Sequence, residues 1–134
     1  MITEPIFELD AFPTQAELAP LWLAAWDNPV SPNYAQNLAR SLCHGVIWDG
    51  ETRRLIGFVN VAWDGGAHGF LLDTTVHPDF QRRGLATELV RLVTEEARAR
   101  GAEWLHVDFE PHLESFYRGC GFRPTAAGLL KLSP

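Results

Sequence analysis

The stretch VHPDFQRRGLAT, residues 76–87, lies between two runs of different periodicity. The run before it, GFLLDTTV (69–76), is apolar and rich in β-branched residues, which is typical of a strand. The run after it, ELVRLVTEEARARG (88–101), repeats apolar residues at helical spacing. Because Pro78 cannot supply a ladder N–H group, the strand should end before it. The stretch therefore predicts a loop that leads from a strand into a long helix over residues 84–100.

A loop of this kind can bind an anion. The first N–H groups of a helix have no intrahelical partner, and the positive end of the helix dipole adds to them. Gly84 lets the backbone approach a phosphate, while Gln81, Arg82 and Arg83 add side-chain donors. The alternative is a turn glycine beside two solvated arginines, but the flanking strand and helix favour the anion site. Neither GxxxxGK[ST] nor GxGxxG is present, so neither a P-loop nor a dinucleotide fold is indicated.

The rest of the chain predicts a mixed α+β fold. Thr14 and Glu17 form a capping-box pattern, and Pro20 could shorten or kink the helix that follows. The expected elements are helices at 15–26 and 33–42, strands at 45–50, 54–66 and 68–76, the long helix, a strand at 104–109, a short helix at 111–119 and a last strand at 129–132. This order predicts a mostly antiparallel sheet with one parallel pair, flanked by helices.

Length and composition indicate one domain over residues 1–134, with 46% hydrophobic and 21% charged residues. The first ten residues lack the basic and apolar regions of a signal peptide, and no run is long enough to span a membrane, so a cytoplasmic location is expected. A net charge of −6 argues against nucleic-acid or membrane partners. Cys43 and Cys120 lack a CxxC pattern and are expected to be reduced thiols. The five histidines show no ligand spacing, so no metal site is expected.

Two motifs resemble one known family. QRRGLA (81–86) resembles the [QR]xxGx[GA] acyl-CoA pyrophosphate loop of the GNAT superfamily of N-acetyltransferases, and VHPDF (76–80) resembles the strand exit before it. SFYRGCGF (115–122) resembles the FYxxxGF segment of the same family, about 30 residues further on and in the expected order. The resemblance covers residues 69–124. It implies an acetyl-CoA-dependent N-acetyltransferase acting on a primary amine of a small molecule or peptide.

The resemblance also implies where acetyl-CoA lies. The cofactor would occupy a wedge between splayed strands at 69–76 and 104–109, with backbone groups near Val76 bonding the pantetheine arm. The pyrophosphate would be held by the residues that follow: Gln81, Arg82, Arg83, Gly84, Leu85, Ala86 and Thr87. One departure is Glu110, where many family members carry an asparagine that contacts the pantetheine; a carboxylate cannot replace that amide donor.

Two catalytic residues are expected. Tyr117 matches the tyrosine that protonates the departing thiolate in the family, although a core aromatic side chain is the alternative. Strand alternation places Asp73 on the face of Leu71 and Thr75, and a buried carboxylate is costly without a partner or a function. Asp73 is therefore the candidate base, directly or through water, unless it only bonds a neighbour. Weaker candidates for the base are His77, His106, His112 and Glu110.

The acceptor pocket is the least patterned part of the chain. Aromatic and polar residues of the first two helices and the facing strands are its expected lining: Trp22, Trp26, Tyr34, Asn60 and Trp63. Such a pocket would suit a cationic amine, although each tryptophan alone could equally be core. A weakly catalytic acyl-CoA sensor is the alternative function, favoured by Glu110. The resemblance also implies that a homodimer through C-terminal strands can form.

Overall fold

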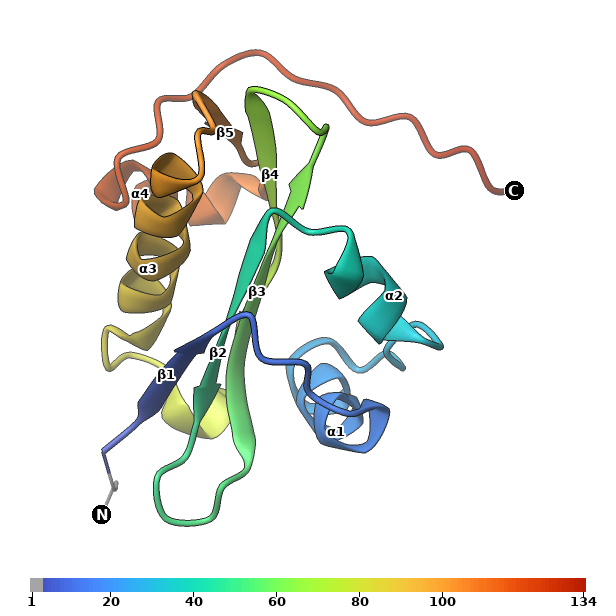
Figure 1. The fold of residues 1–134 in the computed structure, drawn as a ribbon, viewed down its shortest axis with the longest axis vertical. Coiled ribbons are helices and arrows are strands. Elements are labelled where there is room, and N and C mark those ends of the chain that lie inside the picture. Colours follow the sequence, from blue (N-terminus) through green and yellow to red (C-terminus); the bar gives the residue numbers. More distant parts are fainter. Residues whose placement is uncertain (1–3) are drawn as a thin grey trace.

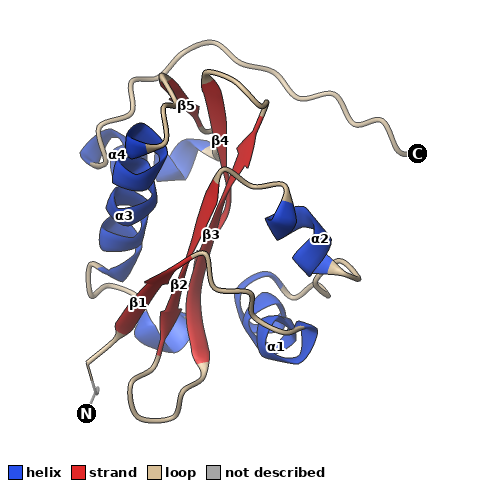
Figure 2. Cartoon of the chain, viewed as in Figure 1, coloured by secondary structure: helices blue, strands red, loops and turns tan. Residues whose placement is uncertain are grey.

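The structure is a computed structural model that describes residues 4–134, and Figures 1 and 2 show a twisted sheet with helices on both faces. In chain order the elements are β1 (Ile6–Leu9), α1 (Gln15–Trp26), α2 (Tyr34–Ala39), β2 (Cys43–Trp48), β3 (Leu55–Trp63), β4 (His68–Val76), α3 (Leu85–Ala99), β5 (Trp104–His106) and α4 (Glu114–Gly119), with 3-10 turns at Pro78–Phe80 and Pro111–Leu113. None of the helices in residues 4–134 is long and apolar enough to cross a membrane.

The five strands form one sheet in the order β1-β2-β3-β4-β5. Neighbours from β1 to β4 are antiparallel, and β4 pairs with β5 in parallel. Helix α3 packs on one face with Tyr117 of α4, and helices α1 and α2 pack on the other face (Figure 1). Because β4 and β5 are parallel, α3 must cross over between them. The predicted fold class is confirmed.

Several local predictions are also confirmed. The Thr14 side chain accepts from the Glu17 N–H group and the Glu17 side chain accepts from the Thr14 N–H group, which completes the capping box at the start of α1. Helix α1 continues through Pro20 to Trp26, so the proline does not shorten it. Strand β4 has the predicted bounds, and α3 begins directly after Gly84. Each of these features is determined by residues that are close together in the sequence.

Three strand predictions are wrong. Strand β1 was not expected, and it forms because its four residues pair with β2. Strand β5 ends at His106 rather than at residue 109. The last strand, expected at 129–132, is absent from the described residues: Leu129, Leu130 and Leu132 are 84–89% exposed on an extended segment that leaves the body (Figure 1). A strand needs a paired neighbour as well as apolar residues, and this segment has none.

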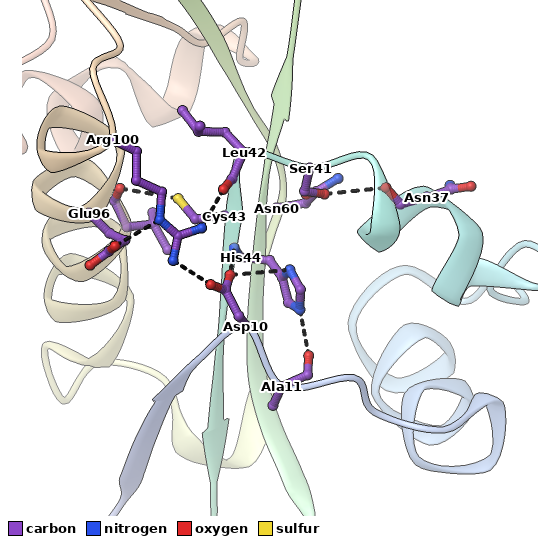
Figure 3. Close-up of polar contacts among 11 residues, drawn as sticks. Asp10, Ala11, Asn37, Ser41, Leu42, Cys43, His44, Asn60, Glu96 and Arg100 are labelled. Atoms are coloured by element: carbon purple, nitrogen blue, oxygen red, sulfur yellow. Dashed lines mark hydrogen bonds and ion pairs between the residues drawn. The ribbon is translucent and has the colours of Figure 1, made fainter. Parts of the chain in front are cut away.

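A buried histidine on β2 packs against the segment that follows β1 (Figure 3). His44 is 2% exposed; its Nε2 donates to the Ala11 carbonyl, and its Nδ1 lies 3.7 Å from the Asp10 carboxylate. Arg100, at the end of α3, donates to Asp10, to Glu96 and to the Leu42 carbonyl. The cluster ties the helix to the start of the sheet while keeping the imidazole away from water.

We expect the free energy of unfolding to fall as the pH decreases below about 6.5, the ordinary pKa of histidine. Burial lowers the pKa of His44 below its ordinary value, so the unfolded chain binds this proton before the folded chain does. The contribution is complete above about pH 6.5 and is lost below it, with a slope approaching about 1.4 kcal/mol per pH unit. Urea unfolding at several pH values measures this slope.

His44→Gln removes the titrating ring and can still donate to the Ala11 carbonyl, so it should flatten the pH dependence. His112→Gln is the matched control, because His112 is exposed and should leave the slope unchanged. An unaltered slope in His44→Gln would contradict the assignment.

Candidate functional site

Strands β4 and β5 separate after a short parallel pairing, which opens a wedge at the edge of the sheet. The ladder ends at the pair Phe70 and His106, whereas β4 continues to Val76. The His77 N–H group bonds Ile56 on the β3 side, so alternation directs the N–H and C=O groups of Val76 toward the opposite side. The predicted splay is confirmed, with a shorter second strand than expected.

The loop after β4 presents free backbone donors. Gly84 is the N-cap of α3 with φ 74°, in the left-handed region that favours glycine, and the first bond of the helix runs from Glu88 N–H to Gly84 C=O. In the described chain, the N–H groups of Leu85, Ala86 and Thr87 therefore have no partner. They lie at the positive end of a 15-residue helix, which favours a bound anion.

Polar side chains extend this loop. The Gln81 side chain donates to the Val76 carbonyl at 3.1 Å and so closes the loop against the end of β4. Arg82 and Arg83 are exposed, and neither takes part in an ion pair within residues 4–134; the Arg83 guanidinium lies 5.6 Å from the centre of the Phe80 ring. Two arginine charges are thus available to an anionic ligand.

A cavity of about 560 Å³ joins this loop to the end of β4 and to helices α1 and α4. Its volume is within the range of small-molecule sites. Its lining residues are Ala25, Trp26, Thr74, Thr75, Val76, Phe80, Gln81, Arg82, Gly84, Leu85, Ala86, Thr87, Leu113, Phe116 and Tyr117. Among the residues predicted to hold the cofactor, Arg83 alone is outside this lining.

Tyr117 lies in the cavity on α4 and is 7% exposed. Its ring stacks on Phe109 with centroids 4.9 Å apart and meets Phe116 and Phe122 edge-on, so its orientation is fixed by packing. Thr74 lines the same cavity. Burial raises the pKa of the Tyr117 phenol, so the hydroxyl is protonated at neutral pH and can donate a proton.

The structure corrects the position expected for Asp73. Strand β4 holds one extra residue between the pairs Asn60–Leu72 and Phe58–Thr75, and Asp73 has φ 59° at this bulge. Leu71 consequently packs in the core beside α3, while Thr75 pairs with Phe58 of the other core, so these two residues do not share a face. Asp73 is exposed rather than buried, and it accepts a hydrogen bond from the Tyr34 hydroxyl.

The predicted substrate residues do not come together as one pocket. Trp26 is 38% exposed and lines the cavity, whereas Trp22 is buried. Tyr34 and Asn60 are 3% and 4% exposed, so little of either side chain reaches solvent. Trp63 donates to the Gly66 carbonyl in the turn between β3 and β4, outside the cavity lining.

Sequence reasoning missed Thr74, Phe80 and Leu113, which also line the cavity. A threonine pair at 74–75 in an otherwise apolar run was the available signal for Thr74. Glu110 is exposed and lies outside the lining. Cys43 and Cys120 are free thiols, and residues 4–134 contain no group of three or more side chains that could hold a metal ion.

Comparisons with known proteins agree with this geometry. A family model described as "Acetyltransferase (GNAT) family" matches residues 6–122. An uncharacterized N-acetyltransferase, ycf52, from Porphyra purpurea is 33% identical over 72 residues, which cover 54% of this chain and 41% of that protein. The matched segment is thus less than half of that relative.

Solved structures resemble the whole chain. A GNAT family acetyltransferase from Streptococcus pneumoniae TIGR4 has a TM-score of 0.81 at 20% identity, covering 97% of this chain and 98% of that chain. A Bacillus subtilis acetyltransferase in complex with CoA has a TM-score of 0.73 at 25% identity, covering 92% of this chain and 79% of that chain. With the family model spanning both motifs and the splayed strands, the chain belongs to the GNAT acetyltransferase family.

Proposed function

We propose that this protein is an N-acetyltransferase that moves an acetyl group directly from acetyl-CoA to a primary amine. The observation that carries the proposal is the single cavity that joins the free N–H groups at the start of α3 to the Tyr117 hydroxyl. The Bacillus subtilis structure in complex with CoA supports the choice of cofactor. The pyrophosphate of acetyl-CoA requires exposed hydrogen-bond donors and positive charge, which the loop N–H groups and two unpaired arginines offer. The pantetheine arm requires an open wedge between the strands.

The chain's own residues fit the steps of this reaction. Acetyl-CoA, when bound, supplies the acetyl group as a thioester. The N–H groups of residues 85–87 would hold the pyrophosphate, and Val76 would bond the pantetheine arm. Tyr117 would give its proton to the departing sulfur, while Asp73 would take the proton that the attacking amine releases, directly or through water. The amine gains an acetyl group and loses one proton, and CoA leaves as the thiol.

Isothermal titration calorimetry with acetyl-CoA tests the cofactor. We expect a Kd in about the micromolar range, and much weaker binding of S-acetylpantetheine, which lacks the pyrophosphate. Equal affinity for the two ligands would refute the role of the loop, and no binding of acetyl-CoA would refute the function. A thiol-release assay across an amine panel then separates an enzyme from a sensor that binds without turnover.

Two further expectations stay predictions. A homodimer is supported by the three leucines of residues 129–132 that project from the body, because exposed apolar side chains of this kind often contact a partner. A cytoplasmic location is consistent with the use of acetyl-CoA. The residues around Asp73 bear on which kind of primary amine the protein accepts.

A further inference from the structure

Asp73 is exposed to solvent at the bulge in β4, and it directly precedes a residue that lines the cavity. The extra residue in β4 places Asp73 on the side of the sheet that carries α1 and α2, where it meets Tyr34. The next residue, Thr74, lines the cavity together with Tyr117. A carboxylate at this point lies one residue from the wall of the cavity where acetyl transfer is proposed.

The buried Tyr34 side chain hydrogen bonds to this carboxylate. Its hydroxyl donates to Asp73 Oδ2 at 2.5 Å, and its ring is packed against Trp22 and Phe58 with centroids 5.2 and 5.7 Å away. Burial, together with the Asp73 carboxylate, raises the pKa of the Tyr34 phenol well above its ordinary value, so the hydroxyl remains a donor. A buried tyrosine cannot bind the acceptor itself, but it can fix the residue that does.

The direction of this hydrogen bond follows from its two partners. A carboxylate oxygen accepts, so the Tyr34 proton points at Asp73. Nearby, the Ser41 hydroxyl lies within hydrogen-bond distance of both the Asn60 Oδ1 atom and the Asn37 carbonyl (Figure 3).

The other oxygen of Asp73 is left for a ligand. Only Oδ2 has a hydrogen-bond partner within residues 4–134, and the side chain is exposed. Trp26, which meets Trp22 edge-on at 4.9 Å, adds an aromatic face to the adjacent cavity. A carboxylate with one free oxygen and an indole on the adjacent cavity each favour an ammonium group, and a net charge of −6 favours the approach of a cation.

We infer that Tyr34 is a positioning residue that holds Asp73 as a binding site for the ammonium group of the acceptor. The inference rests on the proposed function and narrows the acceptors to aliphatic amines that are protonated at neutral pH. Neutral aromatic amines and alcohols lack the charge that this site recognises. Tyr34 thus acts through Asp73 rather than by contact with the substrate.

Binding of two isosteric probes tests this inference without turnover. Butylamine is a cation at pH 7 and 1-butanol is neutral; both are titrated into the protein, with and without CoA, while the Trp26 indole N–H resonance is followed by NMR. We expect butylamine to bind about fivefold to tenfold more tightly than 1-butanol. Equal binding of the probes, or no binding of the amine, would overturn the inference.

The variants separate positioning from folding. Asp73→Asn should abolish the preference for the cation, and because Asp73 is exposed this variant should fold. Tyr34→Phe should reduce the preference several-fold. An undiminished preference in folded Tyr34→Phe, or in Asp73→Asn, would contradict the positioning role.

The proposed function and this inference can fail separately. A protein that prefers butylamine but does not bind acetyl-CoA would refute the proposed function and leave the amine site standing. A protein that binds acetyl-CoA and acetylates butylamine and aniline equally well would refute the inference alone. In an active protein, Tyr34→Phe should raise KM for butylamine more than it lowers kcat.

Discussion

Tyr117→Phe is expected to lower kcat by about 100- to 1,000-fold while leaving the Kd for acetyl-CoA unchanged. The substitution removes one hydroxyl from the cavity and keeps the ring that packs on Phe109. The thiolate that leaves CoA would then depart without a proton donor from the protein. Thiol release at saturating acetyl-CoA gives kcat, and titration calorimetry gives Kd.

Tyr34→Phe is the matched control for this experiment, because it removes the same atom from the other tyrosine. Tyr34 hydrogen bonds to Asp73 and is not part of the cavity lining, so Tyr34→Phe should change KM for the amine more than kcat. A kcat of Tyr117→Phe equal to that of the unaltered protein would remove Tyr117 as the acid.

Gly84→Val is expected to weaken acetyl-CoA binding by about tenfold or more, which corresponds to about 1.4 kcal/mol. Gly84 lines the cavity at the N-cap of α3, and no other group lies within 4 Å of the position that a Cβ atom would take. The new side chain would therefore extend into open space where the pyrophosphate is proposed to lie. Its φ of 74° adds strain of roughly 1–2 kcal/mol for a residue other than glycine.

Gly101→Val controls for that strain. Gly101 has φ 98° directly after α3, at the other end of the same helix, and its Cβ position is also open. Both variants should lose a similar amount of stability in urea unfolding, but Gly101→Val should keep the affinity for acetyl-CoA. Equal affinities for Gly84→Val and Gly101→Val would refute the pyrophosphate assignment of the loop.

Much of the proposed cofactor site could be predicted because it is local. The loop residues 81–87 are contiguous, and the function proposed for them follows from a strand end, a glycine and the start of a helix. Tyr117 was identifiable from the motif around it, and the cavity brings it to the loop. Backbone donors at a helix start depend little on what the rest of the chain does.

The acceptor half could not be predicted in the same way. Strand alternation predicted a buried Asp73 on the face of Leu71, but one extra residue in β4 turns the side chain out to solvent. Tyr34 and Asn60 were predicted to contact the substrate, yet both are buried. A bulge arises from the register between β3 and β4, and no spacing within a single strand reveals it.

The sequence by itself determined the α+β class, the capping box of α1, the bounds of β4 and the loop at the start of α3, because each depends on residues near one another in the chain. The tertiary structure decided β1, the length of β5, the exposed course of residues 129–132 and the meeting of Tyr34 with Asp73. These features depend on pairing between segments far apart in the chain, and a strand or a buried hydrogen bond exists only where its partner is brought to it.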